Sequence, residues 1–119
     1  MVAMRISSNL SAITLALGLA SVSCATTSQT GNLLRANSNL KSGDAQDALE
    51  IADFILGSPP ANAEIAAQAT LIKGLSLEAL GRQHEAACVY QFATERYPNA
   101  PSGAQARGRA KQLAVSCDE

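Results

Sequence analysis

Two stretches of this chain carry small and apolar residues at the same spacing. In both stretches the residue numbers of successive positions advance by 7, 5, 4, 3 and 5. The first series is Ala36, Gly43, Ala48, Ala52, Ile55 and Pro60, and the second is Gly74, Gly81, Ala86, Tyr90, Ala93 and Pro98. A repeat with this offset, from Gly43 to Gly81, indicates that copies of one supersecondary unit stack against each other.

The residue types in the two series predict that each unit is a pair of helices. Gly43 and Gly81 can adopt the left-handed conformation that ends a helix. Tyr90 and Ala93 follow Ala86 at the fourth and seventh positions, which places all three on one helix face. The proline that closes each series cannot continue a helix. Abundant alanine and few β-branched residues after Thr30 also favour helices over strands.

We therefore expect an all-α fold with helices over about residues 31–42, 45–57, 62–80, 82–97 and 101–116. Pro101 suits the first turn of the last helix, because proline is favoured there. The apolar face of that helix would consist of Ala106, Ala110, Leu113 and Cys117. Chains of 119 residues usually form one domain, so these helices are expected to pack together.

The stretch "GLSLEALGRQHEAACVYQFATERYP" resembles the tetratricopeptide repeat, and "ANSNLKSGDAQDALEIADFILGSPP" resembles it less closely, since Ala52 and Ile55 replace an aromatic residue and alanine. The resemblance covers about residues 29–100, with a period about four residues longer than the family's. It implies a helix–turn–helix array of two repeats, closed by a C-terminal capping helix, that acts by binding proteins.

Tetratricopeptide proteins often hold peptides in a concave groove lined by the first helix of each pair. By resemblance, the groove candidates are Leu33, Asn37, Leu40, Lys41, Gln68, Leu71, Leu75, Glu78, Gln105, Arg109 and Gln112. Asn37 matches part of the family's clamp for a C-terminal carboxylate, but Leu33 and Ser102 do not. We therefore do not predict that specificity.

Residues 1–23 have the features of a signal peptide: Arg5, then the short apolar run "LSAITLALGLASV". "SVSC" resembles the lipobox of bacterial lipoproteins, although Ser21 stands where that pattern favours leucine. The resemblance implies lipidation of Cys24, a tether over residues 24–30, a helical domain over 31–119 and, because Ala25 follows, an outer-membrane location facing the periplasm. Ordinary cleavage, giving a soluble periplasmic protein, and an uncleaved anchor remain as alternatives.

Two further cysteines, Cys88 and Cys117, would then lie outside the cytoplasm, where disulfides persist. A bond between them would close a loop of about 30 residues and stabilise the fold by about 3 kcal/mol. A hairpin that turns near Asn99 would place Cys88 opposite residue 111, so the chain end would have to fold back. Two buried thiols, or a redox or metal role, are the alternatives.

His84 and Cys88 share one helix face a turn apart, which is also a spacing of metal ligands. A zinc site needs at least a third protein ligand, and the chain has one histidine. The position of Ala86 in the repeat instead places His84 and Glu85 in the first turn of a helix, at the surface. We predict no metal, no cofactor and no catalytic residue, and keep a Cys88–His84 thiol enzyme as an alternative.

The net charge of −1 and the aromatic content of 3% argue against nucleic-acid binding, which needs a basic surface. An acidic group and a basic group of side chains are expected to be solvated, with contacts to a partner, or to an anionic membrane for the basic group, as the alternatives. The acidic group is Asp44, Asp47, Glu50 and Asp53, and the basic group is Arg96, Arg107, Arg109 and Lys111.

The sequence thus predicts a small, lipid-anchored adaptor or accessory protein of the bacterial cell envelope that binds a protein or peptide partner. A self-associating structural lipoprotein is a further alternative, and the oligomeric state is left open.

Overall fold

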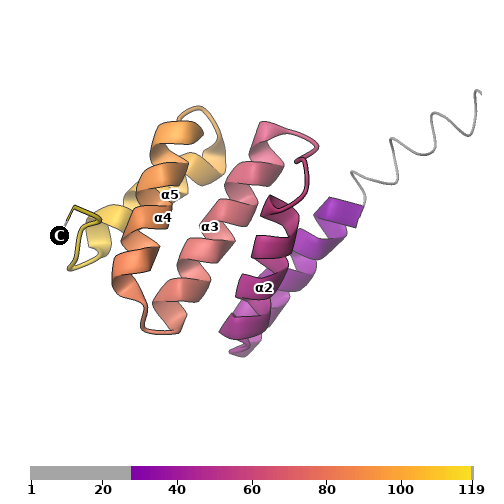
Figure 1. The fold of residues 1–119 in the computed structure, drawn as a ribbon, viewed down its shortest axis with the longest axis horizontal. Helices are drawn as coiled ribbons and strands as arrows, with labels where there is room; N and C mark the ends of the chain where they lie inside the picture. Colours follow the sequence, from indigo (N-terminus) through magenta and orange to yellow (C-terminus); the bar gives the residue numbers. More distant parts are fainter. Residues whose placement is uncertain (1–27, 119) are drawn as a thin grey trace, which may run out of the picture.

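The computed structural model describes residues 28–118, and helices are the regular secondary structure of that range. A first helix over residues 28–42 is followed by α2 (Ala45–Leu56), α3 (Ala63–Ala79), α4 (Gln83–Arg96) and α5 (Pro101–Gln112). The predicted all-α class is confirmed. The helices lie side by side in chain order, with the first helix at one end and the C-terminal segment at the other (Figure 1).

The predicted bounds of α2, α3 and α4 agree with the structure to within one residue. The first helix already includes residues 28–30, which the sequence assigned to a tether. The predicted signal peptide over residues 1–23 and the lipidation candidate Cys24 lie outside the described residues.

Both predicted glycine turns have the expected backbone conformation. Gly43 and Gly81 have φ angles of 95° and 79°, in the left-handed region. The residue after each glycine donates its backbone N–H to a carbonyl of the preceding helix: Asp44 to Asn39 and Arg82 to Leu77, both at 2.8 Å. These bonds satisfy carbonyl groups that a helix end leaves free, and they turn the chain sharply into the next helix.

Two clusters of buried apolar side chains form the core of residues 28–118. The first joins the first helix, α2 and α3 through Leu33, Ala36, Ala48, Ala52, Ile55, Ile65, Ala69 and Ile72. The second joins α2 to α5 through Leu49, Leu71, Leu77, Ala86, Tyr90, Ala93 and Ala106. Many members are alanine, so the helices pack closely, and Tyr90 is the largest fully buried side chain.

The end of the last helix differs from the prediction. The helix ends at Gln112 and not near residue 116, because Leu113 is extended, with a ψ angle of 143°. The following residues run back to α4, so that the Cα atoms of Cys88 and Cys117 lie 4.6 Å apart. The sequence predicted Cys117 on the apolar face of the last helix. That prediction is wrong, because Cys117 lies beyond the end of α5. A straight helix would carry it past the level of Cys88.

Candidate functional site

A groove of about 440 Å³ lies between the first helix, α3 and α5. It is the feature that we refer to as the groove. The first helix contributes Thr30, Leu33, Leu34 and Asn37; α3 contributes Glu64, Gln68, Leu71, Ile72 and Leu75; α5 contributes Pro101, Ser102 and Gln105. In α3 the lining residues recur mainly at three- and four-residue steps, which is the spacing of one helix face. The groove therefore lies across alternate helices of the row.

The groove combines an apolar floor with a polar rim. Leu33 and Leu71 are buried, whereas the amide side chains of Asn37 and Gln105 are exposed. Such a surface can cover apolar side chains while its amides pair with the backbone N–H and C=O groups of a bound segment.

Glu64 ties the α5 wall of the groove to α3. Its Oε1 atom accepts hydrogen bonds from Ser102 Oγ at 2.8 Å and from Gln68 Nε2 at 3.1 Å. Its Oε2 atom is buried and has no hydrogen-bond partner among residues 28–118. One carboxylate oxygen at the groove wall is thus an unused acceptor, a condition that is uncommon for buried polar atoms.

Six of the eleven groove candidates line this groove: Leu33, Asn37, Gln68, Leu71, Leu75 and Gln105. The other five, Leu40, Lys41, Glu78, Arg109 and Gln112, are not among its lining residues. Leu40 instead packs against the first core cluster.

Half of the lining residues were not among the candidates: Thr30, Leu34, Glu64, Ile72, Pro101 and Ser102. One signal for two of them was present in the sequence, since Leu34 and Ile72 are separated by the same offset as Gly43 and Gly81.

Glu78, Arg109 and Gln112 form a polar network between α3 and α5. Both carboxylate oxygens of Glu78 accept from Arg109: Oε1 from Nη2 at 2.5 Å and Oε2 from Nε at 3.1 Å. Arg109 Nη1 also donates to Gln112 Oε1 at 2.7 Å. The buried hydroxyl of Tyr90 donates to Glu78 Oε2. These side chains therefore satisfy each other, and they hold α5 against α3.

Burial and the network shift the protonation of its members. Burial raises the pKa of Glu78, but the hydrogen bonds from Arg109 and Tyr90 outweigh it, so the net pKa is below its ordinary value. Burial and the hydrogen bond to Glu78 raise the pKa of Tyr90. At neutral pH Glu78 is therefore a carboxylate and Tyr90 a neutral donor.

The structure brings Cys88 and Cys117 together as a disulfide, with 2.01 Å between their Sγ atoms. The Sγ atom of Cys88 also lies 4.0 Å from Nε2 of the exposed His84. Nucleophilic catalysis by a cysteine requires its thiolate, and a sulfur in a disulfide is not a thiolate. Within residues 28–118, no group of three or more His, Cys, Asp or Glu side chains could hold a metal ion.

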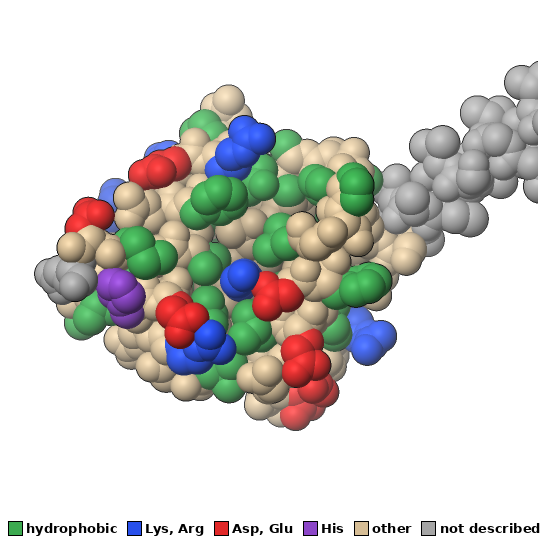
Figure 2. All heavy atoms as spheres, viewed as in Figure 1, with side chains coloured by type: hydrophobic (Ala, Val, Ile, Leu, Met, Phe, Trp, Pro, Cys, Tyr) green, Lys and Arg blue, Asp and Glu red, His purple; other side chains and the backbone are tan. Residues whose placement is uncertain are grey.

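Acidic and hydrophobic side chains share the surface over α2, as Figure 2 shows. Asp44, Asp47, Glu50 and Asp53 are all exposed, and Asp53 forms an ion pair with Lys73 of α3 at 2.8 Å. Of the predicted basic group, Arg96, Arg107 and Lys111 are exposed, whereas Arg109 is engaged by Glu78. None of the described helices is both long and apolar enough to span a membrane.

Comparison of the chain with protein families, with curated proteins and with solved structures found no match. The groove and its chemistry therefore carry the functional proposal.

Proposed function

We propose that this chain is a protein-binding module and not an enzyme, and that the groove holds a segment of a partner protein. The main support for this proposal is the groove, in which three helices surround an apolar floor rimmed by amide side chains. Its volume of about 440 Å³ lies in the range of sites that bury ligands.

The helical pairs are, in this proposal, two tetratricopeptide-like repeats followed by a capping helix. The constant offset between the two series and the left-handed glycines at both turns support it. The stretch "ERYPNAPSGAQAR" also resembles the repeat junctions of outer-membrane assembly and cell-envelope lipoproteins.

The cellular part of the proposal is an adaptor or accessory lipoprotein of the bacterial envelope, anchored through acylated Cys24 and facing the periplasm. An anchor of this kind would keep the groove close to membrane-bound partners. The intact mass of the protein extracted from membranes tests this part, because cleavage before Cys24 and acylation each change the mass. An unmodified chain that retains residues 1–23 would contradict it.

The groove is tested by two matched substitutions of exposed glutamines. Gln105→Arg places a long charged side chain in the groove, whereas Gln91→Arg places one on α4, away from the groove. Tagged protein is cross-linked in envelope preparations, and the captured partners are quantified by mass spectrometry. We expect Gln105→Arg to lower capture about tenfold, the effect of about 1.4 kcal/mol in binding, and Gln91→Arg to leave it unchanged. Equal capture by both variants would refute a role for the groove.

The alternative of a thiol-dependent enzyme has no support from the surroundings of Cys88, because its sulfur is bonded to Cys117.

A further inference from the structure

The first helix exposes one stripe of side chains along the end of the row of helices. Gly31, Leu34, Arg35 and Ser38 follow each other at helical spacing, so they lie on one face, and all four are exposed. We call them the edge stripe. Leu34 stands at the boundary between this stripe and the groove, which it also lines.

The same chemistry recurs on α3, one repeat later, at Ala69, Ile72, Lys73 and Ser76. Both stripes read small residue, aliphatic residue, cation and serine. On α3 the stripe is a helix-packing surface: Ala69 and Ser76 are fully buried, and Ile72 belongs to the first core cluster. Ile72 is 7% exposed, whereas Leu34 at the corresponding position is 68% exposed. The same kind of packing surface is thus present on both helices. Among the described residues, the surface on α3 is covered and the one on the first helix is not.

The element that covers the α3 stripe is α2, and it supplies two kinds of side chain. Asp53 pairs with the cation Lys73 at 2.8 Å, and Ala52 and Ile55 pack beside Ile72 in the first core cluster. A partner that covers the edge stripe must supply the equivalents, an acid for Arg35 and apolar side chains for Leu34.

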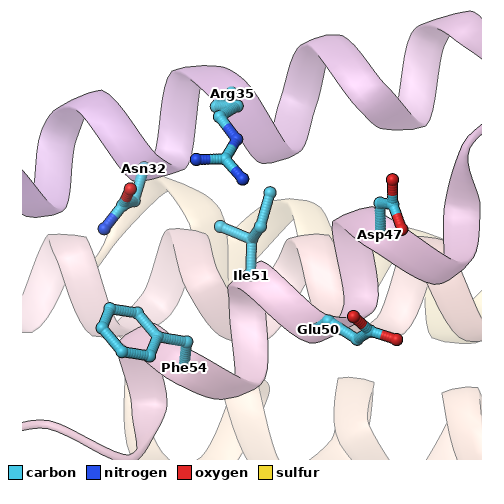
Figure 3. A pocket seen from close by; sticks show the side chains of 6 residues that line it. All are labelled: Asn32, Arg35, Asp47, Glu50, Ile51 and Phe54. Atoms are coloured by element: carbon cyan, nitrogen blue, oxygen red, sulfur yellow. The ribbon is translucent and has the colours of Figure 1, made fainter.

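Both kinds of side chain lie beside the edge stripe itself. An open hollow of about 330 Å³ separates the first helix from α2 and is lined by Asn32, Arg35, Asp47, Glu50, Ile51 and Phe54. Figure 3 shows Arg35 reaching from the first helix toward Ile51, with Phe54 on one side and the acids Asp47 and Glu50 on the other. Phe54 is 68% exposed. No salt bridge engages Arg35, Asp47 or Glu50 within residues 28–118.

We propose that this end of the array binds a second copy of the chain across a two-fold axis. In a two-fold interface the same patch meets itself, so a patch must carry both members of each complementary pair. This patch does so, because Arg35 of each copy can meet Asp47 and Glu50 of the other. Leu34, Ile51 and Phe54 supply the apolar surface that such a contact buries. The proposal does not depend on the groove binding a peptide.

Light scattering after size exclusion, on the purified protein over a range of concentrations, tests the proposal. We expect the unmodified protein to have twice the mass of one chain and Leu34→Asp to have the mass of one chain. Lys111→Glu reverses an exposed charge on α5, away from the patch, and should leave the dimer intact. A single-chain mass of the unmodified protein at every concentration would overturn the proposal. That result would leave the edge to residues 1–27 or to a different helical protein.

A charge exchange tests the pairing. Arg35→Glu makes the charges of the patch all acidic, and the double substitution Asp47→Arg with Glu50→Arg makes them all basic. Each variant alone should be monomeric, because like charges would face each other, and an equal mixture should form a heterodimer. Circular dichroism controls for folding, since all three positions are exposed. Homodimers of either variant, or a mixture that stays monomeric, would refute this interface.

Discussion

Glu78 of α3 accepts two hydrogen bonds from the guanidinium of Arg109 of α5, at 2.5 and 3.1 Å, and these bonds join positions 31 residues apart. A bidentate pair of this kind fixes orientation as well as distance. It therefore fastens the last helix to the rest of the array at the end of α3 farthest from Glu64. The two ends of the α3–α5 contact are held by separate polar bonds.

Acidification should weaken this fastening, with the direction set by the pKa of Glu78. That pKa is lowered in the folded chain from an ordinary value of 4.5, so the unfolded chain takes up a proton first as pH falls. The stabilisation is complete above the ordinary pKa and is lost as pH falls through the lowered one. We expect urea unfolding to show a decline in the free energy of unfolding below about pH 4.5, and Glu78→Gln to decline less. Equal acid sensitivity of both proteins would contradict this assignment.

Replacing Arg109 should destabilise the chain at neutral pH, because a largely buried carboxylate would lose its charged donor. Arg109→Ala is expected to lower the free energy of unfolding by about 1–3 kcal/mol. Arg109→Lys should recover part of this loss, since lysine keeps the charge but cannot form both bonds. Arg107→Ala, at an exposed position of the same helix, serves as the control and should change stability by less than about 0.5 kcal/mol.

Gly74 and Tyr90 are matched in size across α3 and α4. A Cβ atom at Gly74 would lie 2.7 Å from Cδ1 of Tyr90, which is closer than side chains tolerate. We expect Gly74→Ala to cost about 1–3 kcal/mol in thermal or urea unfolding, as overpacking does. In the first pair Ala36 corresponds to Gly74 and Ala52 corresponds to Tyr90. A side chain larger than that of glycine is thus combined there with one smaller than that of tyrosine. The double variant Gly74→Ala with Tyr90→Ala should therefore lose less stability than the two single losses combined.

The left-handed glycines and an ordinary helical glycine should respond in opposite directions to alanine. Gly81→Ala forces a side chain into a φ angle of 79° and should destabilise by about 1 kcal/mol. At Gly108, inside α5, a Cβ atom would meet nothing within 4 Å. Gly108→Ala should stabilise the chain by about 0.5–1 kcal/mol through helix propensity. A stabilised Gly81→Ala variant would show that this turn differs from the one described.

The disulfide should respond to reductant with a measurable loss of stability. Its cysteines are 29 residues apart, and a loop of this size predicts about 3–4 kcal/mol. Reduction should lower the free energy of unfolding by that amount in the unmodified protein, and Cys117→Ser should be insensitive to reductant. Without reductant, Cys88 should not react with iodoacetamide in the native protein. Rapid alkylation would contradict the disulfide and would favour the thiol-enzyme alternative.

Local signals explain why most helix bounds could be predicted from the sequence. Gly43 and Gly81 end helices through their own backbone freedom, and the prolines act on their immediate neighbours. The end of α5 could not be found in this way, since residues 113–116 include neither glycine nor proline. Beyond this point the chain runs to α4, where Cys117 is bonded to Cys88, a residue 29 positions away in the sequence.

The groove was predicted in part for a related reason. Periodicity places Gln68, Leu71 and Leu75 on one face of α3, but it does not show how far two helices are shifted along each other. That shift decides that Ser102 meets Glu64 and that Arg109 meets Glu78. Glu78 and Arg109 were therefore expected to be available to a ligand, whereas they satisfy each other. Leu34 is exposed because the first helix stands at one end of the row formed by residues 28–118, and periodicity does not show which helix stands there either.

The covalent bond between α4 and the chain end has a consequence for the thermodynamics of recognition. A binding wall that must be ordered when a ligand arrives adds an unfavourable entropy to association. Here the chain beyond α5 is bonded to α4, so α5 is held at both of its ends before any partner arrives. Under reducing conditions the same partner should bind with a less favourable entropy, and the affinity of the groove would then follow the redox state of its surroundings.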